Sequence, residues 1–194
     1  MTLAQAWEES KERGFPNEIA DILKSAQRSD WATLRLLLAI PEFKVPLPGG
    51  TTASQTDLAA IARGEKGLVA IAVEGKVSES FGPTMGERRK GRAIDNDVRL
   101  SFLCEQLGLA NGCPDQIRYQ LLHRTVSALT IARDFFAESA VMLVHSFHSD
   151  SKWLDDFVAF ADLFGCEAKK GQLCNLGSRN GVRLYIGWAS GKAV

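Results

Sequence analysis

The sequence has 194 residues, of which 45% are hydrophobic and 24% are charged, and this composition excludes an intrinsically disordered chain. Its 23 basic and 23 acidic side chains give a formal net charge of zero, so composition alone does not predict a broad basic surface for nucleic acid. The sequence lacks a long apolar run, and its polar N-terminus lacks the pattern of a signal peptide. We therefore expect a single domain, residues 1–194, located in the cytoplasm and without membrane contact.

The first fifty residues predict three helices and one short strand. The helices are expected over residues 3–12, 16–26 and 30–39, with Pro16 at a favourable helix start and Pro41 ending the third. The following segment, FKVPLPGG, is extended and rich in proline. Because proline cannot donate a hydrogen bond to a neighbouring strand, this segment predicts an edge strand.

Two apolar segments, residues 57–62 and 68–74, predict a hairpin closed by the turn RGEKG. Both segments are apolar at odd and even positions, which is typical of strands buried on both faces of a sheet. They therefore form the expected centre of the sheet.

The rest of the chain alternates predicted helices and strands after a charged loop that runs through Arg92. Helices are expected over residues 97–109, 115–136 and 152–164, and strands over residues 140–147 and 181–190. This order predicts an α/β fold in which a central mixed β-sheet is flanked by helices on both faces.

Charged residues stand at one end of the predicted hairpin. A turn centred on Glu65 and Lys66 places Asp57 directly opposite Glu74, and Lys76 then points to the same face. Two carboxylates this close repel unless a cation lies between them, and Mg²⁺ prefers carboxylate oxygens. Lys76 could hold a water or offset the charge of a phosphate. The combination favours hydrolysis of a phosphodiester.

Asp57 followed by Glu74-Gly75-Lys76 resembles the D…(D/E)-x-K signature of the PD-(D/E)XK nuclease superfamily, over residues 16–147. The resemblance implies a restriction-endonuclease-like fold and nuclease activity on nucleic acid, with DNA favoured over RNA. It also implies that Asp57, Glu74 and the carbonyl of Gly75 bind Mg²⁺ (or Mn²⁺), and that Lys76 positions the attacking water. The phrases SQTDLAAIA, AVEGKVSESFGP and RYQLLHRT also resemble a family of stand-alone bacterial proteins of unknown function.

Further site residues follow from the same resemblance. Thr56 stands where the superfamily has its usual proline, and Glu18 is the candidate for the glutamate that members often supply from the first helix. On the helix over residues 115–136, Gln120 and Arg124 are candidates for the polar group that faces the site. The alternative is a helix surface that meets solvent, since one polar face holds Gln116, Tyr119, Gln120 and His123.

A non-catalytic reading of the same charges stays open. Charged tripeptides of the E-x-K or D-x-K kind also begin at Glu9, Glu42, Asp150 and Glu167, and only the copy at Glu74 ends an apolar strand. In the alternative, the protein is a binding or regulatory module and Lys76 only neutralises the carboxylates.

Three other features complete the expectations. The segment RRKGR, residues 88–92, is a candidate for contacting phosphates. His145, His148 and Asp150 offer a second, zinc- or iron-type metal site. The cysteines are expected to be reduced and without zinc, because they form no C-x-x-C pair; they are Cys104, Cys113, Cys166 and Cys174.

Overall fold

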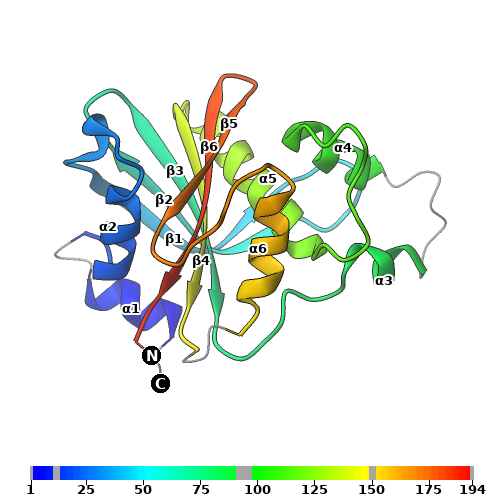
Figure 1. The fold of residues 1–194 in the computed structure, drawn as a ribbon. Coiled ribbons are helices and arrows are strands. Elements are labelled where there is room, and N and C mark those ends of the chain that lie inside the picture. The colour runs from blue at the N-terminus through cyan, green and yellow to red at the C-terminus, as the bar shows by residue number, and fades with distance from the viewer. Residues whose placement is uncertain (1, 11–13, 91–97, 149–151, 193–194) are drawn as a thin grey trace.

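Six strands form one mixed sheet with helices on both faces in the computed structural model, which describes residues 2–10, 14–90, 98–148 and 152–192 (Figure 1). The sheet order is β1-β2-β3-β4-β6-β5. Strands β3, β4 and β6 run parallel, and the other neighbouring pairs are antiparallel. The expected α/β class is confirmed. The strands are β1 (Arg35–Val45), β2 (Ser54–Arg63), β3 (Leu68–Lys76), β4 (Ser139–Ser146), β5 (Leu173–Arg179) and β6 (Val182–Ser190).

Each face of the sheet has its own group of helices and its own apolar core (Figure 1). One face is covered by α1 (Leu3–Glu9), α2 (Asn17–Lys24) and the short 3-10 helix η1 (Ser29–Trp31). The other face is covered by α4 (Val98–Leu107), α5 (Tyr119–Asp134) and α6 (Leu154–Asp162). A further helix, α3 (Met85–Lys90), joins the segment before α5 through a hydrogen bond from the Met85 N–H to the Ile117 carbonyl.

The predicted central hairpin is confirmed, and so is its register. Strand β2 pairs with β3 from Arg63↔Leu68 to Leu58↔Val73, as the turn at RGEKG predicts. Both strands are buried between the two helical layers, which explains why their sequences are apolar at odd and even positions.

The helix expected over residues 30–39 is wrong. The short helix η1 is followed by strand β1, which pairs with β2 along its length. Pairing along the open edge of β2 outweighs the helical spacing of the leucines, because β1 and β2 share hydrogen bonds from Arg35↔Arg63 to Val45↔Ser54. Pro41 is tolerated within β1 because this strand lies at the edge of the sheet, as expected for the FKVPLPGG segment.

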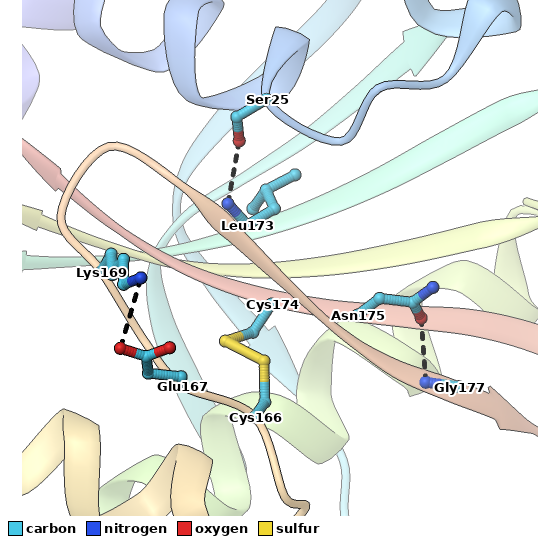
Figure 2. Close-up of a disulfide and its surroundings, with 8 residues drawn as sticks. All are labelled: Ser25, Cys166, Glu167, Lys169, Leu173, Cys174, Asn175 and Gly177. Carbon is cyan, nitrogen blue, oxygen red and sulfur yellow. Dashed lines mark hydrogen bonds and ion pairs between the residues drawn. A yellow bond between two sulfur atoms is a disulfide. The ribbon is translucent and has the colours of Figure 1, made fainter.

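The expectation that every cysteine is reduced is also wrong. Cys166, in the loop after α6, forms a disulfide with Cys174 on β5 (Figure 2). Cys104 and Cys113 are free and buried. The same region is fastened to the opposite helical layer, where the N–H of Leu173 donates to the hydroxyl of Ser25 at 2.9 Å. The sequence pattern does not predict strand β5.

The remaining differences concern helix ends and one short helix. Helix α5 begins at Tyr119 instead of residue 115, and α1 ends at Glu9 instead of residue 12. Helix α3 occupies part of the expected charged loop.

In the described part of the chain, no helix combines the length and the apolar character needed to cross a membrane.

Candidate functional site

The hairpin opens at the end that carries the charges. Backbone pairing stops at Leu58↔Val73, one position before the expected pair of Asp57 with Glu74. Beyond this pair, side chains form the hydrogen bonds between the two strands. The hydroxyl of Thr56 donates to the Val73 carbonyl at 3.1 Å. The carboxylate of Asp57 accepts a hydrogen bond from the Gly75 N–H at 2.8 Å. The two strands therefore part at this point, and their charged residues line the opening.

Glu74 is the centre of a buried polar network beneath α5. One of its oxygens accepts from the Lys76 ammonium at 2.8 Å and from the amide of Gln120 at 2.7 Å, and the other accepts from the Arg124 guanidinium. Lys76 also donates to the amide oxygen of Gln120 at 3.2 Å. Glu74 is 4% exposed and Lys76 is 2% exposed, so both charged groups are shielded from water. The attraction between them offsets the cost of this desolvation.

Asp57 is compensated less well than Glu74. Burial raises its pKa to about 6, and the negative charge of Glu74 adds to the effect, while the Gly75 N–H, Arg124 and Lys76 oppose it. Within the residues that the structure describes, Asp57 forms no ion pair. It is thus the carboxyl group at the opening whose charge still needs a partner.

A cavity of about 600 Å³ lies over these residues. Asp57, Glu74 and Lys76 line it from the sheet, and Gln120 and Arg124 line it from α5. Its volume lies within the range of pockets that hold small ligands. The helix candidates Gln120 and Arg124 therefore do face the charged end of the hairpin.

The donors present fit a hard divalent cation. Mg²⁺ is commonly held by one or two carboxylates and several waters, and Asp57 offers a carboxylate that forms no ion pair among the described residues. A carboxylate has about four acceptor positions, of which Glu74 uses three on Lys76, Gln120 and Arg124, so one remains. Among the described residues, no three His, Cys, Asp or Glu side chains converge as a metal site, so waters would complete the coordination.

Glu18 is elsewhere. Its carboxylate lies 2.9 Å from Nε2 of His145, on the face covered by α1 and α2, whereas Glu74 lies beneath α5 on the other face. Burial lowers the pKa of His145, and the hydrogen bond to Glu18 acts in the opposite direction. The expected helix glutamate therefore does not join the two carboxylates, because α2 packs across the sheet from them.

The structure does not bring together the second candidate metal site or the basic segment RRKGR. The imidazole of His145 lies against the carboxylate of Glu18. The N–H of His148 donates to the Ser146 hydroxyl at 3.4 Å. Asp150 lies outside the described residues. Of the segment RRKGR, the Arg88 guanidinium lies over the ring of Tyr119 and Arg89 pairs with Asp115. Gly91 and Arg92 of that segment lie outside the described residues.

Two residues of the site had no signal in the sequence. Arg99 lines the cavity from α4, because the loop after β1 brings the Leu47 and Pro48 carbonyls to its guanidinium. Ser54 accepts from Arg124 at 3.0 Å and fixes the end of β2 against α5. Both contacts depend on segments that are more than fifty residues apart in the chain.

A family model described as Domain of unknown function (DUF6946) matches residues 1–193, so the chain belongs to this family. Neither the curated proteins nor the solved structures include a match to the chain.

Proposed function

We propose that the protein is a Mg²⁺-dependent nuclease, also active with Mn²⁺, that hydrolyses phosphodiester bonds of nucleic acid at the opened end of the β2–β3 hairpin. The observation that carries the proposal is the poorly compensated carboxyl of Asp57 beside the buried Glu74–Lys76 pair, in a cavity large enough for a nucleotide. DNA is the favoured substrate over RNA.

The order of elements agrees with a restriction-endonuclease-like fold. Helix α2 precedes the antiparallel strands β1, β2 and β3, and α5 then leads to β4, which runs parallel to β3. In that fold the first acidic residue lies near the start of the second strand and the E-x-K tripeptide ends the third, which are the positions of Asp57 and of Glu74 with Lys76.

The carboxylates of Asp57 and Glu74, with the carbonyl of Gly75, would hold the cation. When bound, a divalent cation supplies Lewis-acid stabilisation of the phosphoryl group and a more acidic water. The residues around it have separate tasks. Arg124 and Gln120 fix the carboxylate of Glu74, and Asp57 is fixed by the Gly75 N–H.

Lys76 is placed to bind the attacking water or a phosphate oxygen. An ammonium group has three donors, and in the described structure Glu74 and Gln120 accept two of them. The ring of Phe81 lies 4.8 Å from the ammonium nitrogen and shields another side of it. Because Lys76 lines the cavity, we infer that its third donor meets a group that enters there.

One observation favours the second candidate, a non-catalytic module on the same fold. Lys76 and Arg124 balance the charge of Glu74 without a metal ion, and Gln120 adds a hydrogen bond. In that case the network is structural, and the protein would act by binding a partner.

An assay of cleavage separates the two candidates. Single- and double-stranded DNA and RNA are incubated with Mg²⁺, Mn²⁺ or EDTA, using wild type, Lys76→Met and the control Lys66→Met in the exposed hairpin turn. A nuclease cleaves at least one substrate with metal, not in EDTA, and loses the activity in Lys76→Met only. Cleavage that is absent throughout, or equal in Lys76→Met and wild type, would overturn the nuclease proposal.

A further inference from the structure

The cavity over Glu74 has one wall that the hydrolytic residues leave unused. This wall carries Tyr119, His123 and Arg99, which lie beyond the carboxylates. We propose that it is a subsite for one unpaired nucleotide, with the aromatic rings stacking on the base and Arg99 holding a phosphate, so that the substrate is single-stranded nucleic acid. This inference rests on the proposed function, since it specifies the form of the nuclease substrate.

The burial of the charged residues limits what can reach them. Glu74 and Lys76 are 4% and 2% exposed, so a phosphodiester bond must enter the cavity to touch them. The volume of about 600 Å³ accommodates a ligand of nucleotide size. A base-paired duplex keeps each nucleotide stacked in a continuous rod, which does not fit such a hollow. A single strand can turn one nucleotide into it at a much lower cost.

The aromatic wall is fixed in place before a ligand arrives. Tyr119 and His123 lie one turn apart on α5, with ring centroids 5.0 Å apart. The guanidinium of Arg88 lies 3.9 Å from the centre of the Tyr119 ring, and the hydroxyl of Ser54 lies 2.9 Å from Nδ1 of His123. A rigid aromatic surface binds any base through its π-face, so such contacts require no particular sequence.

The imidazole of His123 is uncharged at neutral pH. Burial lowers its pKa to about 3, and the positive charges of Arg124, Arg99 and Arg88 add to the effect. It therefore offers the cavity a neutral ring, while the charge for binding phosphates comes from the arginines.

Arg99 is a fixed cation without an acidic partner among the described residues. Its guanidinium donates to the carbonyls of Leu47 and Pro48 at 2.9 and 3.2 Å, which orient it without cancelling its charge. The approach needs glycine: a Cβ at Gly49 would lie 2.2 Å from the Arg99 backbone, and one at Gly50 would lie 2.8 Å from its guanidinium. A guanidinium held in this way suits a phosphate group.

Binding is tested without cleavage by adding EDTA and measuring the fluorescence anisotropy of labelled oligonucleotides. The three probes have equal length: a DNA single strand, the matching duplex and a single strand of abasic sites. We expect the single strand to bind about tenfold or more tightly than the duplex. The abasic strand should bind about 5- to 100-fold more weakly than the normal strand, because it has no bases to stack.

Variants test whether Tyr119 and Arg99 account for the binding of the single strand. Tyr119→Ala should weaken binding of the normal strand about tenfold and leave the abasic strand unaffected, whereas Tyr119→Phe should retain binding. Phe136→Ala is the aromatic control, since Phe136 is 91% exposed at the far end of α5. Arg99→Ala should weaken both single strands and lower the slope of log affinity against log salt by about 0.7, while the exposed control Arg63→Ala should not.

The outcomes separate this inference from the nuclease proposal. Equal binding of duplex and single strand, or of normal and abasic strands by wild type, overturns the subsite, even if Mg²⁺-dependent cleavage is found. The abasic comparison needs no variant and therefore holds even if Tyr119→Ala does not fold. Tight binding that depends on the bases and on Tyr119, without cleavage under any condition, supports the subsite and overturns the nuclease.

Discussion

The carboxylate of Asp57 accepts a 2.8 Å hydrogen bond from the backbone N–H of Gly75, which sits between the two charged residues of the E-x-K tripeptide. This single contact replaces a rung of the β2–β3 ladder by a side chain. It links the strands beyond their last backbone pair, and it keeps a poorly compensated carboxyl group beside Glu74. The arrangement is unfavourable for the free protein, which is the usual condition of a residue kept for its chemistry.

Replacing Asp57 by Asn should stabilise the metal-free protein above pH 6. The pKa of Asp57 is about 6 in the folded state against an ordinary value of 3.8, so the folded state holds the proton more tightly than the unfolded state. Stability is therefore lost as the pH rises from about 4 to about 6, by about 1–2 kcal/mol after allowance for solvent contact. Asn removes this loss and can still accept from Gly75. Urea unfolding at pH 4 and pH 8 measures the difference.

The control for this prediction is Glu65→Gln in the exposed hairpin turn, which should change stability equally little at both pH values. An Asp57→Asn protein that is less stable than wild type at pH 8 would show that the aspartate charge is compensated after all.

Arg124→Met should destabilise the fold by about 3 kcal/mol, because it leaves one oxygen of the buried Glu74 carboxylate without its cation. Adding Glu74→Gln to the same protein should restore part of that loss, since the uncompensated charge is then gone. Chemical denaturation of the two single variants and the double variant gives the coupling. Strictly additive losses would show that the two side chains stabilise the protein independently.

Reduction of the disulfide between Cys166 and Cys174 should lower the stability by about 2.5 kcal/mol, the value expected for closing a loop of this sequence separation of 8. Thermal unfolding with and without a reductant measures it. Cys166→Ser should unfold at the temperature of the reduced wild type, and Cys104→Ser should keep its response to the reductant. A wild type that is indifferent to the reductant would contradict the prediction.

Glu18→Gln should leave metal-dependent cleavage unchanged, because Glu18 contacts His145 on the other face of the sheet. Glu74→Gln should abolish it. The comparison is made on the substrate that wild type cleaves best, at saturating Mg²⁺. Equal losses in the two variants would place Glu18 among the metal ligands despite its position.

The sequence predicted those parts of the site that depend on short-range geometry. The short turn sets the register of Asp57 and Glu74 to within one backbone pair. Gln120 and Arg124 are candidates through the resemblance, and in the structure both contact Glu74 from α5. Residues 30–39 have helical spacing, but those from Arg35 onward form a strand that pairs with the open edge of β2.

Other features depend on segments that meet only in the folded chain. The spacing of Cys166 and Cys174 says nothing of pairing until the loop after α6 turns back against β5. Arg99 reaches the cavity only because Gly49 and Gly50 leave room for it. The resemblance assigns Glu18 to the site, whereas the packing of α2 places it across the sheet.

The most direct test of the central proposal is anomalous diffraction from crystals soaked in Mn²⁺. The proposal predicts a peak in contact with the carboxylates of both Asp57 and Glu74 in wild type, and no peak there in Asp57→Asn. A wild-type crystal without that peak at saturating Mn²⁺, in which Lys76 and Arg124 still hold Glu74, would contradict it and would leave the charged network with a structural role.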